Sequence, residues 1–242
     1  MKEIFSSFMD RDKKKATNSI DNGVITVEFI KENPLVESYL SAADRHMSYL
    51  GYTEHGKRHA NLVSNISHNI LRRLGKSERD SALAAIAGYL HDIGSLVNRH
   101  HHAETGALLA HQILNNIGLE PKETAEIIAA IGNHDESHFD PVSSITAALV
   151  LADKSDVHRS RIRSTDLASF SALDRVNYAV ENSFLRVDHE NHSITLELSI
   201  NTEISQVMDY FELSLQRMLI SQKSASFLNC KFNLVINVTK LL

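Results

Sequence analysis

The sequence places a histidine next to an aspartate at the end of a segment that is predicted to be a buried helix. His91 and Asp92 follow residues 81–90, which are mostly apolar and good helix formers. An imidazole and a carboxylate in the core carry a desolvation penalty unless a partner such as a divalent cation offsets it. Successive helical residues diverge by about 100°, so both side chains reach one point only where the helix loosens, and Gly94 is expected to end it. Taken alone, the pair is equally compatible with capping contacts.

Four other residues of metal-binding type flank this dipeptide at distances that let successive helices bring them to one point. They are His59, His102, His134 and Asp153. Asp153 ends an apolar run, where an aspartate is rarely an indifferent surface group, although a capping role is the alternative. Asp140 and Pro141 are expected to start the helix that carries it.

Two histidines four residues apart compete for the first position of this set. His59 lies within a helical run, whereas His55 precedes Gly56 at the entrance of the helix. We favour His59 as the ligand because the helix backbone fixes its direction better. His55 is then expected to orient ligands or to face the substrate, and the reverse assignment is the alternative.

Histidine and aspartate form a set of nitrogen and oxygen donors without cysteine. Such a set suits iron, manganese, zinc, nickel or cobalt and is less typical of an all-oxygen magnesium site. We therefore expect one or two divalent transition-metal ions as the cofactor. A bridging carboxylate, for which we favour Asp92, would hold two ions about 3.5–4 Å apart and position a water molecule between them.

The order of these residues resembles that of a known family. His59, His91-Asp92 and Asp153 follow one another as in the HD superfamily of metal-dependent phosphohydrolases, whose signature stretch H-D-I-G is present. The resemblance covers roughly residues 45–165. It implies hydrolysis of a phosphomonoester or phosphodiester in a nucleotide or another small phosphorylated molecule.

Two further stretches resemble the binuclear branch of that superfamily. They are H-A-E-T-G-A at 102–107 and A-I-G-N-H-D-E at 130–136, and the resemblance makes His102 and His134 metal ligands. The subclass that cleaves cyclic dinucleotides has paired histidines where this chain has His134 and Asp135, and its G-Y-P tripeptide is missing here. We assign Asp135 a supporting role behind the ligands.

The mechanism that the resemblance implies is attack of a metal-activated hydroxide on phosphorus. Asp92 and Asp153 would orient the nucleophile as well as bind metal, and Lys154 would stabilise the charge on the phosphate oxygens. These three are the expected catalytic residues. Two other functions stay open: an oxygenase with a di-iron centre, such as the inositol oxygenases, which use a similar ligand order, and a sensor that binds metal without catalysis.

Three arginines follow Lys154 and offer further phosphate-binding groups. Arg159 and Arg163 are four residues apart and are expected to share a helix face that points to the substrate phosphate, whereas Arg161 points elsewhere. The alternative is that Asp156 and Asp166 neutralise these arginines as surface pairs.

Hydrophobic periodicity predicts a helical chain that changes character after about residue 182. The expected helices are approximately 35–50, 56–74, 78–92, 101–117, 121–132, 141–160 and 171–181. Alternation of apolar and polar residues then predicts a hairpin over 184–200, followed by a helix over 202–220 capped at Asn201 or Thr202 and a strand over 232–238.

The predicted fold is mainly α, an HD-type helical bundle with a small α+β appendage of β-β-α-β order. We expect three parts: an N-terminal segment (1–34) with a strand at 23–30, the helical hydrolase domain (35–182) and the appendage (183–242). The exposed sheet edges favour a homodimer through the appendage or pairing with the N-terminal strand. The alternative is that the appendage is a lid that stabilises the bundle.

Composition limits the classes of partner. The 242 residues include 43% hydrophobic and 23% charged residues, as in an ordinary globular protein. The net charge of −5 argues against a nucleic-acid polymer as partner. Cys230 is the single cysteine, and no apolar segment near the N-terminus is long enough for secretion or membrane insertion. We therefore expect a cytoplasmic protein that has a small phosphorylated substrate and no membrane partner.

Overall fold

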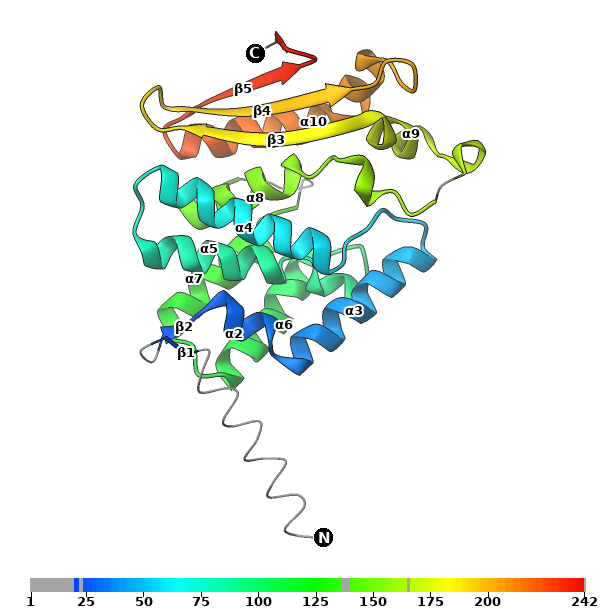
Figure 1. Cartoon of the computed structure of the whole chain (residues 1–242). Coiled ribbons are helices and arrows are strands. Elements are labelled where there is room, and N and C mark those ends of the chain that lie inside the picture. Colours follow the sequence, from blue (N-terminus) through cyan, green and yellow to red (C-terminus); the bar gives the residue numbers. More distant parts are fainter. Residues whose placement is uncertain (1–19, 22–23, 136–139, 165, 242) are drawn as a thin grey trace.

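A computed structural model of the chain describes residues 20–21, 24–135, 140–164 and 166–241. One part is a bundle of helices, and the other is a sheet with the long helix α10 (Val207–Phe227) behind it (Figure 1). Buried residues of sheet and bundle belong to one continuous hydrophobic cluster. The prediction of a mainly helical fold with a small C-terminal α+β part is confirmed. Among the described helices, none combines the length and the apolar character needed to cross a bilayer.

The helices of the bundle begin close to their predicted starts. Their bounds are α2 (Val27–Lys31), α3 (Pro34–Tyr49), α4 (Lys57–Arg73), α5 (Glu78–Leu90), α6 (His102–Asn116), α7 (Pro121–Gly132), α8 (Ser144–Ser155) and α9 (Ala172–Ala179). Short 3₁₀ turns are η1 (Ile93–Leu96), η3 (Arg159–Arg161) and η4 (Leu167–Ser169). Helix α5 packs against α4, α7 and α8, and all its residues from Leu83 to Leu90 are buried, as predicted for a core helix.

The start of α8 differs from its prediction. Ser143 caps this helix, because its hydroxyl accepts a hydrogen bond from the backbone N–H of Thr146 at 3.1 Å. The prediction that Asp140 and Pro141 start the helix is therefore wrong. The sequence holds several residues that can cap a helix here, and the hydroxyl nearest the apolar run is the one that does so.

The end of α8 also differs, and this changes the arrangement of the arginines. The helix ends at Ser155, and the chain turns at Asp156, whose side chain is bound inside the protein. Arg159 lies in η3, and Arg163 follows in extended chain beyond it. The prediction that Arg159 and Arg163 share a helix face is therefore wrong.

The N-terminal segment forms a strand only over a short stretch. β2 (Val24–Ile25) pairs with β1 (Ile20–Asp21) and not with the C-terminal sheet. The Thr26 hydroxyl accepts a hydrogen bond from the backbone N–H of Phe29 at 3.3 Å and so starts α2. The predicted strand at 23–30 is therefore wrong beyond residue 25, and Gly23 lies outside the described residues.

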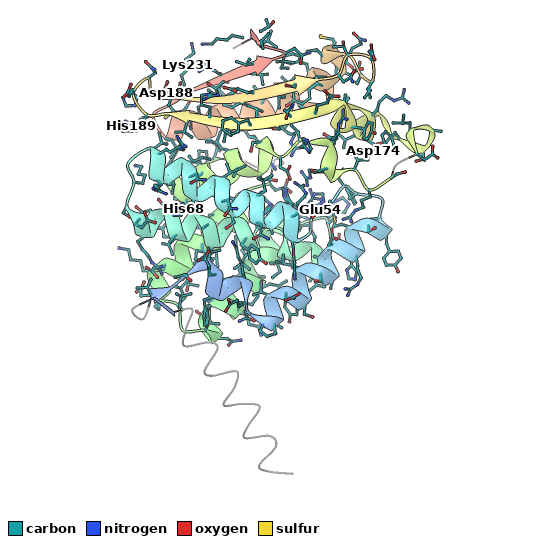
Figure 2. All side chains as sticks on the ribbon, viewed as in Figure 1. Glu54, His68, Asp174, Asp188, His189 and Lys231 are labelled. Atoms are coloured by element: carbon teal, nitrogen blue, oxygen red, sulfur yellow. The ribbon has the colours of Figure 1, made fainter. Side chains whose placement is uncertain are left out.

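The C-terminal sheet has the strand order β3-β4-β5-β6. Its strands are β3 (Val180–Asp188), β4 (Ser193–Ile200), β5 (Lys231–Ile236) and β6 (Thr239–Lys240). β3 and β4 form the predicted antiparallel hairpin, and α10 connects β4 to β5, which runs parallel to it. His189 in the hairpin turn lies at the opposite end of the sheet from Asp174 of α9 (Figure 2).

The helix of this region begins later than predicted. Gln206 caps α10 in a capping box with Asp209, so the predicted cap at Asn201 or Thr202 is wrong. Asn201 instead ends the hairpin, where its backbone N–H donates to the carbonyl of Ala179 at 2.8 Å and its side chain accepts from the N–H of Glu203. Asparagine can form the hydrogen bonds of a helix cap or those of a strand end, and tertiary contacts determine which of the two it forms.

Gly94 brings the turn after α5 against α6. A Cβ atom on Gly94 would clash with the backbone of His102 and Gly106, and it would lie 2.9 Å from the Cα atom of Gly106. The prediction that Gly94 ends the helix is wrong, because α5 ends at Leu90 and Gly94 lies within η1 with a φ that is not positive. Its function is close approach: it lets the turn that carries Asp92 touch the helix that carries His102.

We predict that Gly94→Ala destabilises the protein by about 1–3 kcal/mol or more, because backbone atoms must move to admit the methyl group. Urea unfolding followed by circular dichroism measures the change. Gly132→Ala is the matched control, since the nearest atom to its Cβ would be Ala107 Cβ at an ordinary 3.6 Å. Equal stability of the two variants would show that η1 does not depend on this contact.

Candidate metal centre

The six residues predicted as metal ligands come together at one place in the bundle. They lie near the start of α4, after α5, at the start of α6, after α7 and near the end of α8, and they are His59, His91, Asp92, His102, His134 and Asp153. All six are buried. Five segments of chain thus deliver four imidazoles and two carboxylates to the interior.

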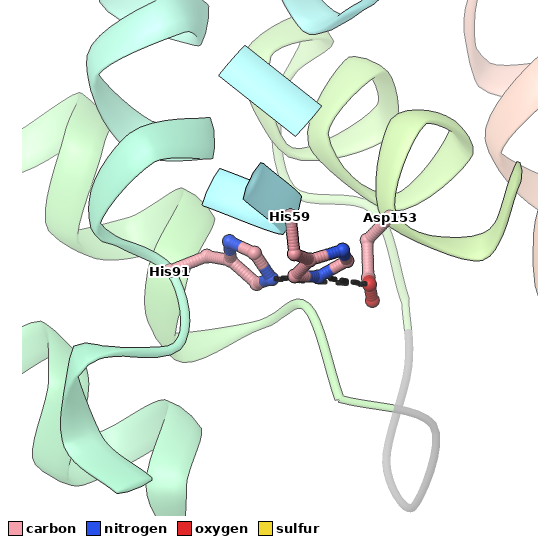
Figure 3. Close-up of side chains that lie close together, drawn as sticks. All are labelled: His59, His91 and Asp153. Atoms are coloured by element: carbon pink, nitrogen blue, oxygen red, sulfur yellow. Dashed lines mark hydrogen bonds and ion pairs between the residues drawn. The ribbon is translucent and has the colours of Figure 1, made fainter. Parts of the chain in front are cut away.

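The imidazoles form two pairs, each with its Nε2 atoms facing one another. In the first pair, His59 Nε2 and His91 Nε2 are 3.2 Å apart, and Asp153 Oδ1 lies 3.3 Å from His59 Nε2 (Figure 3). In the second pair, His102 Nε2 and His134 Nε2 are 3.1 Å apart. Two nitrogens that bind one ion at about 2.1 Å, at octahedral or tetrahedral angles, are about 3.0–3.4 Å apart. Both separations therefore have the spacing of nitrogens that share a cation.

The other nitrogen of each ring faces an oxygen that can only accept a hydrogen bond. The Nδ1 contacts are His59 with Asp156 Oδ2 at 2.7 Å, His91 with Gly88 O at 2.9 Å, His102 with Arg99 O at 3.1 Å and His134 with Ile131 O at 2.6 Å. Each Nδ1 must therefore carry hydrogen and donate it, which leaves Nε2 of a neutral ring as a bare lone pair. This is the tautomer in which histidine binds a metal through Nε2.

The protonation state of His102 and His134 indicates whether a cation fits this centre. Burial lowers the pKa of His102 and lowers the pKa of His134 well below its usual value, so both rings are neutral at pH 7. Their Nε2 lone pairs then face each other without a proton between them, which is an unfavourable contact in a buried site. A divalent cation that accepts both lone pairs removes that conflict, and the nitrogen and oxygen donors fit one.

Asp92 has one oxygen toward each imidazole pair. Its Oδ2 lies 3.3 Å from His91 Nε2 and its Oδ1 lies 3.5 Å from His102 Nε2. Burial alone would raise the pKa of Asp92, but the neighbouring ring of His91 lowers it well below the usual range. Burial alone would lower the pKa of His91, but the charge of Asp92 outweighs that effect and raises it. An ionised carboxylate in this position suits the bridging role that we predicted for it.

Asp153 and Lys154 form a buried ion pair beside the first imidazole pair. Lys154 Nζ donates to Asp153 Oδ2 at 2.6 Å, which leaves Asp153 Oδ1 toward His59. Burial alone would raise the pKa of Asp153, yet the ammonium of Lys154 holds it well below the usual range. Lys154 thus keeps Asp153 ionised and oriented, and its contact with a substrate phosphate stays a prediction.

The two remaining supporting residues lie at the edge of the cluster. His55 donates from Nδ1 to the carbonyl of Thr53 at 2.7 Å, and its ring centroid is 5.7 Å from that of His59. Asp135 Oδ2 lies 3.7 Å from Nδ1 of His102. The structure places the Nε2 atom of His59, and not that of His55, against His91 Nε2, and the assignment of His59 as the ligand stays a prediction.

The arginines predicted to bind phosphate have other partners. Arg159 Nη2 donates to Glu181 at 2.9 Å and its guanidinium covers the ring of Tyr178. Arg163 pairs with Asp44 and donates to the carbonyl of Tyr52 at 3.0 Å. Their role in binding phosphate stays a prediction.

Sequence reasoning missed the function of Asp156. We considered it a surface partner of arginines, but it is buried, and it accepts hydrogen bonds from His59 Nδ1 and, at 2.8 Å, from Arg58 Nη2. Burial would raise the pKa of Asp156, but the hydrogen bond with His59 and the charge of Arg161 lower it strongly. Its partner His59 lies 97 residues earlier in the chain, and Asp156 lies in the turn after α8, so no sequence spacing indicates this contact.

Comparison with known proteins identifies a family whose sequence profile covers the residues of this cluster. The sequence profile of the HD domain matches residues 56–213. An uncharacterized protein of Methanocaldococcus jannaschii is 32% identical over 158 aligned residues, an alignment that covers 56% of this chain and 60% of that protein. The chain therefore matches less than two thirds of the length of that relative.

We predict that Asp92→Ala removes more metal than His134→Ala, because Asp92 has an oxygen toward both imidazole pairs and His134 belongs to one. Elemental analysis after reconstitution with Mn²⁺ measures the metal content. His111→Ala, an exposed histidine on α6, is the control. Equal metal content in Asp92→Ala and the parent protein would contradict the bridging role.

Asp156→Asn is expected to weaken metal binding about tenfold to a hundredfold, as is usual when the carboxylate behind a ligating histidine is lost. An amide accepts a hydrogen bond from Nδ1 less strongly, so His59 is held less firmly in the binding tautomer. Isothermal titration with Mn²⁺ measures the affinity, and Asp140→Asn at an exposed site is the control. A folded Asp156→Asn protein with the parent's affinity would rule out this role.

Proposed function

This chain belongs to the HD-domain family, and from that premise we propose that it hydrolyses the phosphoester bond of a small phosphorylated molecule at a centre of one or two divalent transition-metal ions. The HD domain is typical of a superfamily of metal-dependent phosphohydrolases. The observation that carries the proposal is the buried, neutral pair of His102 and His134, whose lone pairs face each other at 3.1 Å beside the carboxylate of Asp92.

The donors fit two ions that share one carboxylate. His59, His91 and Asp153 would hold one ion, and His102 and His134 would hold the other, with Asp92 between them. Such a pair of ions supplies Lewis-acid stabilisation of phosphate oxygens and a nucleophilic water at neutral pH. Nitrogen and oxygen donors without sulfur support iron, manganese, zinc, nickel or cobalt as the metal.

The protein's own groups have defined tasks in this proposal. Asp153, kept ionised by Lys154, accepts a hydrogen bond from the attacking water and sets its direction. Lys154 adds a positive charge at 2.6 Å from that carboxylate, where charge on the phosphate oxygens grows during the reaction. Arg58 and Arg161 fix Asp156, which fixes His59. The ligand side chains are buried, and this keeps bulk water from competing for the phosphate.

We predict that protein purified without oxygen carries between one and two first-row transition-metal ions per chain and releases phosphate from phosphomonoesters or cleaves phosphodiesters. Elemental analysis and a substrate screen with Mn²⁺, Fe²⁺, Zn²⁺, Ni²⁺ and Co²⁺ test it. Asp153→Asn should lose most of the turnover, because an amide cannot replace the charge of the carboxylate. Arg73→Ala, a surface change on α4, is the control.

The same screen separates the other functions. Oxygen consumption by the iron-loaded protein without phosphate release would support an oxygenase instead. Metal binding with neither activity would support a sensor. Absence of metal, with no uptake on reconstitution, would refute the centre itself.

A further inference from the structure

A cavity of about 490 Å³ lies beside the metal centre, between the C-terminal end of α3 and the turn that follows η1. Arg99 and Ser95 line the side of the cavity that adjoins Asp92: Arg99 Nη1 lies 3.6 Å from Asp92 Oδ1, and the backbone N–H of Ser95 donates to the Asp92 carbonyl at 3.0 Å. This volume is within the range of small-molecule binding sites. The cavity therefore offers room for the part of a substrate that projects from the metals.

Two buried polar atoms on this wall lack hydrogen-bond partners among the described residues. They are Arg99 Nη1 and Ser95 Oγ. A buried donor without an acceptor is unfavourable, so such atoms are rare unless a ligand or water completes them. At 3.6 Å, Asp92 is too far from Arg99 for a hydrogen bond, and metal binding would engage that carboxylate. A phosphate oxygen that reached this wall would accept a hydrogen bond from each of these two groups.

Much of the remaining lining is aromatic or apolar. Tyr52 lies with its ring centroid 5.8 Å from the guanidinium carbon of Arg99, and Tyr49, Leu50 and Val97 also line the cavity. Tyr49 is 89% exposed and Val97 is 63% exposed, although both side chains are large and apolar. A group of such residues at the mouth of a site is typical of a surface that a ligand covers.

We propose that this cavity is a substrate subsite, in which Arg99 binds the phosphate at the metal centre and Tyr52 packs against a planar aromatic group of the same molecule. The substrate class is then a phosphate ester of an alcohol that carries an aromatic or heteroaromatic ring. The inference rests on the proposed function, since it concerns the phosphate of that reaction.

The geometry gives the two residues separate tasks. The planar guanidinium of Arg99 offers parallel donors that match two phosphate oxygens. Arg99 O also accepts the Nδ1 proton of His102, so one residue joins a metal ligand and the subsite. Tyr52 discriminates between ring-bearing and simple esters, because only the former cover its face.

Calorimetric binding to the Mn²⁺-loaded protein tests the subsite, and phosphate release is measured in parallel so that the heat of binding is separated from that of turnover. Adenosine 5′-monophosphate is compared with ribose 5-phosphate, and 1-naphthyl phosphate is compared with inorganic phosphate. Stacking of one aromatic group supports an affinity about tenfold higher or more for the ring-bearing member of a pair. Preference in both pairs indicates a general aromatic subsite, and preference in one pair identifies a nucleotide or an aryl ester. No preference in either pair would overturn the proposal.

Variants separate the two residues. Tyr52→Ala should remove the preference and leave the affinity for inorganic phosphate unchanged, whereas Tyr52→Phe should keep the preference. Arg99→Ala should weaken all four ligands by about tenfold or more at unchanged metal content. Arg99→Gln, which retains most of the packing, replaces it if the alanine variant loses metal. Arg73→Ala is the control for loss of an arginine charge.

The results also separate this inference from the proposed function. Phosphate release without preference for ring-bearing esters would refute the subsite and leave the hydrolase intact. Preference in binding without phosphate release from any ester would refute the hydrolase and leave the subsite. Parent-like affinity for inorganic phosphate in the metal-loaded Arg99→Ala or Arg99→Gln protein would refute the assignment of Arg99.

Discussion

The centre depends on hydrogen bonds that fix the direction and tautomer of four imidazoles. For three of them the acceptor is the backbone carbonyl three residues earlier in the chain, as in the bond of His91 Nδ1 to Gly88 O. This local bond is available because these histidines lie at helix ends, where carbonyls and side chains are not fully engaged by the helix. His59 lies inside α4, and its acceptor is the carboxylate of Asp156 in the turn after α8. The ends of the helices therefore determine where the lone pairs meet.

Packing then determines how closely those ends approach. His91 and Asp92 directly follow the C-terminal end of α5, which packs against α4, α7 and α8. The apolar residues of α5 therefore fix the position of the dipeptide. Gly94 allows the following turn to touch α6 without a side chain between them. Burial on all sides makes each unpaired charge or lone pair unfavourable, and it also strengthens any interaction with a cation. The apolar packing that folds the bundle thus also buries these imidazoles and carboxylates, and a bound cation would offset the free-energy cost of that burial.

Periodicity predicted the helices, the hairpin and the last strand, because each buries an apolar face that recurs at a regular spacing. It failed at helix ends, where Ser143 and Gln206 cap helices that other polar residues were expected to start. Residue type and order identified the six buried residues that come together in the bundle. They could not identify Asp156, whose partner His59 is 97 residues away. Arg99 was missed for a similar reason: no sequence spacing indicates that its Nη1 atom would lie beside Asp92 without a hydrogen-bond partner among the described residues.

The contact between α10 and α8 affects the order in which the chain can mature. Val150 of α8 and Ile220 of α10 are buried together, and Ser183 of β3 donates to the carbonyl of Ser155 at 2.5 Å. The helix that carries Asp153 is therefore buried by residues of α10, which the ribosome adds some 70 positions later. During synthesis, His59, His91, Asp92, His102 and His134 are added well before the residues of α10 that cover α8. The position of Asp153 beside them is therefore completed only after α10 has been added.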